Sequence, residues 1–138
     1  MSRAIFDTNL FISALISPAG VPAQIVAAAL AGRCELIAHA KLLDELREVT
    51  RNPKIAARIT SAEAGRLVNE FADVATFMET LPNVERSPDP RDDFLLALAE
   101  AAAADFLVTG DKADLLVLAT HKGTKIVTAR AFHTFLGL

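Results

Sequence analysis

The stretch IFDTNL at residues 5–10 decides how the rest of the sequence is organised. A short apolar run ends in an acidic residue, and two polar residues follow before the chain turns apolar again. If residues 2–6 form a buried strand, Asp7 lies at its carboxyl end, where ligands bind in open α/β sheets. The same arrangement recurs where residues 105–109 lead through a glycine into Asp111. Two carboxylates at the carboxyl ends of two parallel strands predict a site for a cation or for a phosphate-bearing substrate.

The hydrophobic periodicity predicts strands that alternate with helices along the chain. Strands are expected at residues 2–6, 34–38, 106–109 and 125–128, with a brief extended segment at 81–85. Helices are expected at residues 9–16, 22–32, 41–50, 55–59, 61–77, 91–104, 114–119 and 131–136. Such alternation is typical of a parallel sheet that is covered by helices on both faces. We therefore expect an α/β protein that forms one domain over residues 1–138.

The composition favours an ordered globular protein and excludes few functions. The chain has 138 residues, of which 52% are hydrophobic and 22% are charged. The net charge of -3 gives no sign of nucleic-acid binding, so any such contact would have to come from a local basic patch. The single cysteine, Cys34, cannot form an intramolecular disulfide, and there is no metal-type cysteine spacing. This usage is typical of a reducing compartment.

The sequence also predicts no membrane association. No apolar run reaches the roughly 18 residues that a membrane span needs. The amino-terminal segment has the basic and apolar character of a weak signal peptide, but Asp7 and Asn9 interrupt its apolar region. We expect a cytoplasmic protein.

Glu45 is the first acidic residue between the two strand ends that could reach the same site. On a helix, the apolar stripe within residues 42–49 faces the core, and Glu45 lies at the margin of that stripe. A carboxylate at such a position needs a partner. The alternative is a boundary glutamate that extends to solvent or pairs with Arg51 or Lys41.

Asp93 is the second candidate on a predicted helix. Asp89 suits the N-cap, Pro90 suits the first helical position, and Asp92 faces the free amides of the first turn. Asp93 is not needed for capping, and the small Ala97 one turn later leaves room in front of its carboxylate. The alternative is that Asp93 only adds charge that complements the helix dipole.

A divalent cation would explain these acidic residues together. Asp111 follows a strand and a glycine that lets the backbone approach closely, whereas Asp114 fits a helix N-cap well. Four neighbouring carboxylates repel one another and raise one another's pKa, which a bound cation relieves. Oxygen ligands favour Mg²⁺ or Mn²⁺ over Zn²⁺, and the three histidines are scattered along the sequence. The predicted set is Asp7, Glu45, Asp93 and Asp111.

These motifs, taken in order, resemble the PIN-domain family over nearly the whole chain. The matching segments are FDTN at 6–9, LLDEL at 42–46, DDFLLALA at 92–99, DFLVTGD at 105–111 and IVTARAF at 126–132. The resemblance implies a three-layer α/β/α sandwich around a central parallel sheet of about five strands. It also implies a ribonuclease that depends on Mg²⁺ or Mn²⁺, of the VapC-like kind that serves as the toxin of a toxin–antitoxin pair.

The resemblance also assigns roles to individual residues. The acidic, catalytic residues would be Asp7, Glu45, Asp93 and Asp111, with the metal held by the three aspartates. Asn9 and Thr109 would be the flanking polar groups that meet the substrate. Independently of the resemblance, we expect Lys112 or Arg130 to hold RNA phosphates, unless either is only a solvated surface charge. One departure concerns Asp114, because Ala113 separates it from Lys112, whereas relatives often read GDKDLL.

The expected reaction is in-line hydrolysis of a phosphodiester in single-stranded RNA by a metal-activated water. The expected partners are RNA, an antitoxin protein and further copies of the chain in a homodimer or higher oligomer. Two alternatives remain. A small-substrate phosphatase would need a second aspartate where Asn9 stands. A non-catalytic binding module would show no change in thermal stability with Mg²⁺ or Mn²⁺.

Overall fold

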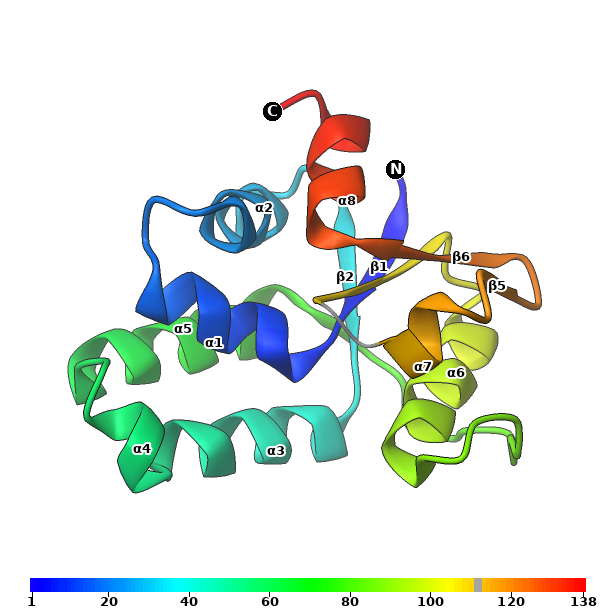
Figure 1. Cartoon of the computed structure of the whole chain (residues 1–138), viewed down its shortest axis with the longest axis horizontal. Coiled ribbons are helices and arrows are strands. Elements are labelled where there is room, and N and C mark those ends of the chain that lie inside the picture. Colours follow the sequence, from blue (N-terminus) through cyan, green and yellow to red (C-terminus); the bar gives the residue numbers. More distant parts are fainter. Residues whose placement is uncertain (111–112) are drawn as a thin grey trace.

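A twisted sheet runs through the molecule, with β1 (Arg3–Phe6) between β2 (Glu35–Ala38) and β4 (Phe106–Thr109) (Figure 1). The computed structural model describes residues 1–110 and 113–138. The other strands are β3 (Thr76–Phe77), β5 (Thr120–His121) and β6 (Thr124–Thr128), and the strand order is β3-β2-β1-β4-β6-β5. All pairs are parallel except β5 with β6. The carboxyl ends of the central strands therefore meet at one edge.

Helices cover both faces of this sheet. They are α1 (Thr8–Ile16), α2 (Val21–Leu30), α3 (Ala40–Arg51), α4 (Pro53–Ala56), α5 (Ser61–Val74), α6 (Pro90–Ala102), α7 (Ala113–Leu116) and α8 (Ala129–Leu136). In Figure 1, α2 and α8 lie together above α1, while α6 and α7 lie on the other side of the strands. The predicted α/β/α architecture is confirmed.

Two details of the sheet differ from the sequence prediction. The helix expected over 61–77 ends at Val74, because Ala75 turns extended and Thr76–Phe77 pairs with β2 as a parallel strand. The segment 120–128 forms a hairpin instead of a turn followed by one strand, because Thr120–His121 pairs with β6 across a turn in which Lys122 and Gly123 both adopt positive φ angles. The sheet thus has six strands, and the extended segment expected at 81–85 is not one of them.

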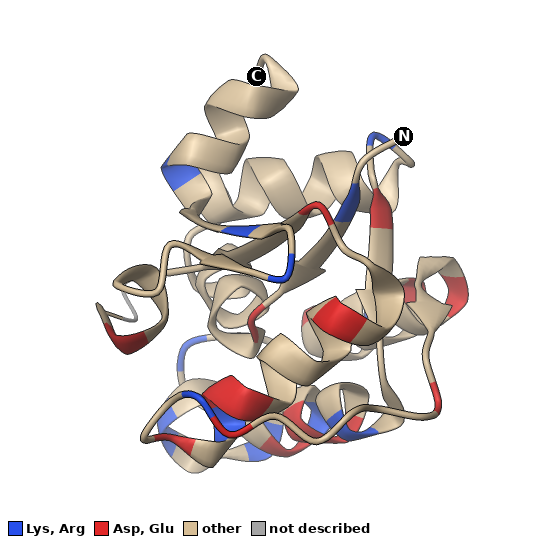
Figure 2. Ribbon diagram, turned by 90° about the vertical axis from the view of Figure 1, so that its right-hand side faces the viewer, with Lys and Arg blue, Asp and Glu red and all other residues tan. Residues whose placement is uncertain are grey.

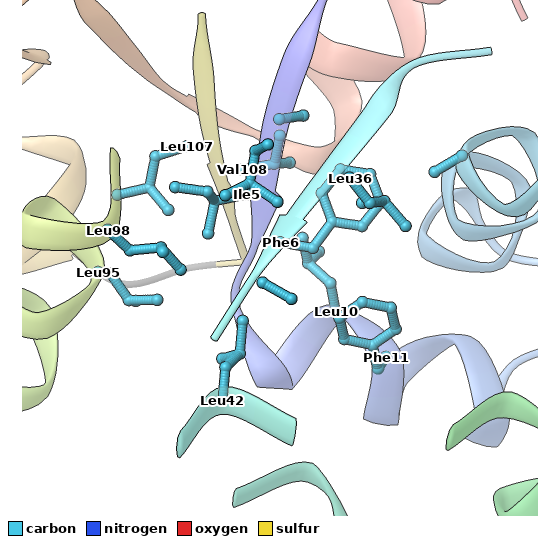
Figure 3. Close-up of a cluster of buried hydrophobic side chains, with 14 of the residues drawn as sticks. Ile5, Phe6, Leu10, Phe11, Leu36, Leu42, Leu95, Leu98, Leu107 and Val108 are labelled. Carbon is cyan, nitrogen blue, oxygen red and sulfur yellow. The ribbon is translucent and has the colours of Figure 1, made fainter. Parts of the chain in front are cut away.

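The central strands β1, β2 and β4 are largely buried on both faces, which explains their mostly apolar sequences. Successive side chains of β1 point to opposite sides (Figure 3): Ile5 projects toward Leu98 of α6, and Phe6 projects toward Phe11 of α1. Phe11 in turn stacks on Phe71 of α5, with ring centroids 4.6 Å apart. This packing fixes the direction in which the chain leaves β1, and hence the position of Asp7.

Two further features bear on the class of protein. Burial raises the pKa of the Cys34 thiol to about 11, so this cysteine is a protonated core side chain. Within the part of the chain that is described, no single helix is long and apolar enough to cross a membrane. Only α1 and α2 taken together reach that length and composition, and they are bent by 112° with respect to each other.

Candidate active site

Asp7 lies at the carboxyl end of β1, and its side chain forms hydrogen bonds to α1 and to β4. Its side chain caps α1 by accepting the Asn9 amide hydrogen at an N···O distance of 3.4 Å. The hydroxyl of Thr109, at the end of β4, donates to the other carboxylate oxygen over 3.2 Å. Asp7 is 6% exposed and Thr109 is fully buried. Thr109 therefore orients the Asp7 carboxylate and does not reach the surface where a substrate would bind.

A small pocket of about 40 Å³ opens directly in front of Asp7. A water molecule needs about 10–15 Å³ of such volume, so the pocket has room for a few waters or a hydrated ion. Its lining residues come from three elements and are Asp7, Thr8, Asn9, Leu42, Glu45, Arg91, Phe94 and Leu95. The predicted pairing of Asp7 with Glu45 and Asn9 in one place is therefore seen in the structure.

Glu45 reaches this pocket because of its place on α3. Leu42 and Leu46 are buried on either side of it, which leaves Glu45 half-buried at the margin of the packed face. Among the described residues, neither Lys41 nor Arg51 forms an ion pair with Glu45. The alternative, in which Glu45 pairs with Lys41 or Arg51 at the surface, is therefore not seen. Glu45 instead lines the Asp7 pocket.

Asp92 and Asp93 at the start of α6 have surroundings opposite to those expected from the sequence. The Asp93 carboxylate accepts the backbone amides of Arg86 and Ser87, over 3.0 and 2.7 Å, and so fixes the preceding loop. Asp92 is only 1% exposed and accepts the Ser87 hydroxyl over 3.1 Å. It lines a second pocket, of about 140 Å³, together with Asp89, Ala113 and Asp114. The inward-facing carboxylate at this helix end is Asp92.

A periodic signal in the sequence could have identified Asp92. The aliphatic residues Leu95, Leu96 and Ala99 follow it by three, four and seven positions, and all three are buried. This spacing places Asp92 on the packed face of α6. The same periodicity also includes Asp93, since Leu96 and Ala97 are buried three and four positions after it, so the signal marks Asp92 as a candidate without excluding Asp93. Capping signals assigned Asp92 to the free first-turn amides of the helix, whereas in the structure Asp89 caps α6 and Asp93 accepts two amides of the preceding loop.

The remaining predicted residues are placed as follows. Asp111 and Lys112 lie outside the described residues. Asp114 is exposed on α7 and belongs to the Asp92 pocket, and Arg130 is exposed at the start of α8. Within residues 1–110 and 113–138, no three Asp, Glu, His or Cys side chains are grouped closely enough to hold a metal ion.

The donor set nevertheless suits a hard divalent cation. Besides Arg91, the ionisable residues that line the first pocket are Asp7 and Glu45, and such carboxylate oxygens favour Mg²⁺ or Mn²⁺. Thr8 also lines this pocket, and its hydroxyl is buried and has no hydrogen-bond partner among the described residues. An unpaired buried hydroxyl is costly unless water or an ion completes it. The pocket therefore fits a hydrated cation.

The fold and site define an α/β protein with carboxylates gathered at the carboxyl edge of a parallel sheet. The chain belongs to the PIN domain family, which residues 3–113 match. PIN domains are generally nucleases and typically use divalent metals. The family assignment made from the sequence motifs is thereby confirmed.

The chain is also similar to two other proteins. The uncharacterized protein MJ1680 of Methanocaldococcus jannaschii is 26% identical over 117 residues, which cover 84% of this chain and 74% of that protein. The crystal structure of PAE2754 from Pyrobaculum aerophilum superposes with a TM-score of 0.68 at 18% identity. The superposition covers 99% of this chain and 90% of that one. At this identity the structural likeness supports the fold alone.

Proposed function

We propose that this chain is an endoribonuclease that depends on Mg²⁺ or Mn²⁺ and hydrolyses phosphodiester bonds in RNA. The observation that carries the proposal is the shared pocket of Asp7 and Glu45, which are 38 positions apart in the sequence and come from different elements. Asp7 also caps α1 and accepts the Thr109 hydroxyl, but these contacts leave Glu45 without an ion-pair partner and the Thr8 hydroxyl without a hydrogen-bond partner among the described residues. A cation site would satisfy both.

Each residue has a distinct role in this proposal. Asp7 is the central metal ligand, because Thr109 and the start of α1 hold its carboxylate in place. Asp92 takes the ligand role that the sequence suggested for Asp93, because Asp92 is buried on the packed face of α6, whereas Asp93 faces the preceding loop and accepts two of its amides. Asp111 keeps its proposed ligand role from the sequence pattern. Glu45 faces the pocket from α3 and is placed to accept a proton from an attacking water.

The metal would supply a Lewis acid and a bound water of lowered pKa. The chain itself supplies negative charge to hold the cation, and Asn9 supplies an exposed amide at the pocket for hydrogen bonds to the substrate. The apolar side of the pocket, formed by Leu42 and Leu95, limits the water that can enter.

We also propose that the nuclease is the toxin of a toxin–antitoxin pair and acts in the cytoplasm. This rests on the resemblance of the ordered motifs to such toxins. A shallow apolar hollow of about 460 Å³ between α1, α2 and α5 offers a surface for an antitoxin or a second copy of the chain. Its apolar lining residues are Ala14, Leu15, Pro18, Ala23, Val26, Ala27, Leu30, Ala31 and Leu67.

The decisive experiment measures cleavage of single-stranded RNA in the presence of Mn²⁺. We expect Asp7→Asn and Glu45→Gln to reduce the rate by about 100-fold or more. Asp44→Asn is the matched control, because Asp44 is an exposed neighbour of Glu45 on the same helix. Equal rates for the wild type and Asp7→Asn would contradict the proposal. Hydrolysis of a small phosphate ester without RNA cleavage would favour the phosphatase alternative.

A further inference from the structure

A lysine and an aromatic ring form a defined unit at the rim of the Asp7–Glu45 pocket. The Lys41 ammonium lies 4.7 Å from the centroid of the Phe94 ring. Phe94 is half-buried and lines the pocket itself. The unit joins the first turn of α3 to the first turn of α6. It thus bridges the two helices that supply Glu45 and Asp92.

Lys41 is not held by an acidic partner. In residues 1–110 and 113–138, its ammonium forms no ion pair, although Glu45 stands one helical turn away on α3. An ammonium beside a carboxylate is largely neutralised, whereas one over an aromatic face keeps its charge available to an incoming anion. The geometry therefore presents a full positive charge at the pocket rim.

The ring beneath Lys41 is held in place by a histidine. His39 contacts Phe94 edge to face, with ring centroids 5.4 Å apart. His39 Nδ1 accepts the Lys41 backbone amide, which caps α3, so Nε2 carries the hydrogen that is donated to the Glu79 carbonyl at 3.3 Å. The imidazole is thereby fixed in one orientation, and it fixes the ring that carries the lysine.

A second cation stands on the same side of the pocket. Arg91 lines the pocket from α6, and its side chain is 70% exposed. Its nearest acidic partner is Asp89, at 3.5 Å, which is a weak exposed pair. Figure 2 shows acidic and basic positions interspersed along the helices at the lower end of the molecule.

We propose that Lys41 and Arg91 bind phosphates of the RNA on the side of the pocket between α3 and α6. The Phe94 ring positions Lys41 through their cation–π contact. This rests on the proposed ribonuclease function. The carboxylates that hold the metal also repel the RNA backbone, so the strand needs nearby cations to approach them. Lys41 and Arg91 also determine the path of the bound RNA, which runs along the starts of α3 and α6.

Binding of a fluorescent single-stranded RNA in EDTA tests the proposal without cleavage. We expect Lys41→Gln and Arg91→Gln each to weaken binding about threefold to tenfold. We expect each to reduce the slope of log K against log salt by about 0.7, as for one lost phosphate contact to a single strand. Phe94→Leu keeps an apolar side chain but removes the ring, and should weaken binding by a similar factor. Lys125→Gln is the control, because this exposed lysine lies near the amino end of β6, at the end of the sheet away from the carboxyl edge.

Cleavage in Mn²⁺ separates this inference from the proposed function. We expect Lys41→Gln to raise KM severalfold with kcat within about twofold, since a uniform binding contact is lost. Unchanged affinity and salt slope in Lys41→Gln and Arg91→Gln would overturn the inference, even if the wild type cleaves RNA and Asp7→Asn does not. A wild type that binds RNA with these slopes but cleaves none would support the binding site and contradict the nuclease. Circular dichroism melting of each variant confirms that it folds.

Discussion

Two adjacent aspartates at the start of α6 differ in what they contact, and this difference predicts different mutant phenotypes. We expect Asp92→Asn to lose about 100-fold or more of the RNA cleavage rate while it remains folded, because a metal ligand is removed. We expect Asp93→Ala to lose about 1–3 kcal/mol of unfolding free energy, because two loop amides lose their acceptor. Urea unfolding and cleavage assays on both variants check this. Full activity in Asp92→Asn would return the ligand role to Asp93.

Two buried threonines beside Asp7 give a second prediction at the residue scale. Thr109→Val removes the hydroxyl that donates to the Asp7 carboxylate, and we expect it to cost about 1.5–3 kcal/mol. Thr8→Val is the matched control, because the Thr8 hydroxyl has no protein partner among the described residues. In the absence of metal it should be neutral or stabilising. Equal destabilisation of the two variants in urea would argue against this account of the site.

At the scale of the strands, Glu35 joins three of them at the amino end of the sheet. Its carboxylate accepts the Thr76 hydroxyl of β3 at 3.0 Å and pairs with Arg3 of β1 at 3.0 Å. The Thr76 hydrogen bond, together with Arg3, lowers the pKa of Glu35 below its ordinary value of 4.5. The charged form is favoured by folding, so its contribution to stability is present above pH 4.5 and is lost as the pH falls through the lowered pKa.

This linkage predicts how Glu35→Gln behaves with pH. The variant should be less stable than the wild type at neutral pH, and the difference should shrink as the pH falls below 4.5. Thermal unfolding across pH measures the difference. If the difference in stability between the wild type and Glu35→Gln stayed constant down to acid pH, the charge of Glu35 would not be what joins the strands.

A hydrogen-bonded network around the buried His121 attaches the loop before α6 to the β5–β6 hairpin. Arg86 donates to the Thr120 carbonyl at 2.7 Å and contacts His121 Nδ1 at 3.1 Å. A guanidinium only donates, so Nδ1 accepts and Nε2 carries the hydrogen that is donated to Glu100 at 3.1 Å. The network holds the loop whose Ser87 contacts Asp92.

We expect His121→Ala to cost about 2–3 kcal/mol, because it leaves a cavity and an unpaired Glu100. The loop amides of Arg86 and Ser87 should then exchange hydrogen faster than in the wild type. Lys125→Ala on the neighbouring strand is the control. Unchanged exchange at these two amides would mean that the hairpin does not hold the loop.

At the scale of the whole molecule, metal binding should be visible as stability. A ligand at 100 times its dissociation constant stabilises the folded state by about 2.7 kcal/mol, so Mg²⁺ or Mn²⁺ should raise the melting temperature. Asp7→Asn should abolish the shift, and Asp44→Asn should keep it. An identical shift in the wild type and Asp7→Asn would place the cation elsewhere.

The sequence by itself determined the layout of this protein. Apolar strands such as residues 3–6 alternate with helices that begin at recognisable caps, for example Asp89 followed by Pro90. These signals are local, because periodicity and capping depend on residues a few positions apart. They suffice for a parallel α/β sheet and for Asp7 at the end of its first strand. The family motifs likewise follow from order and spacing along the chain.

Only the tertiary structure decided which neighbour of a pair faces the site. Asp92 and Asp93 are one position apart, and their orientation depends on how α6 packs against the sheet and on the loop amides of Arg86 and Ser87. The short strands β3 and β5 likewise exist only because β2 and β6 offer them an edge. Lys41 lies over Phe94, although Glu45 is nearer in sequence, because α3 and α6 begin side by side. Such contacts join distant segments, so no local pattern encodes them.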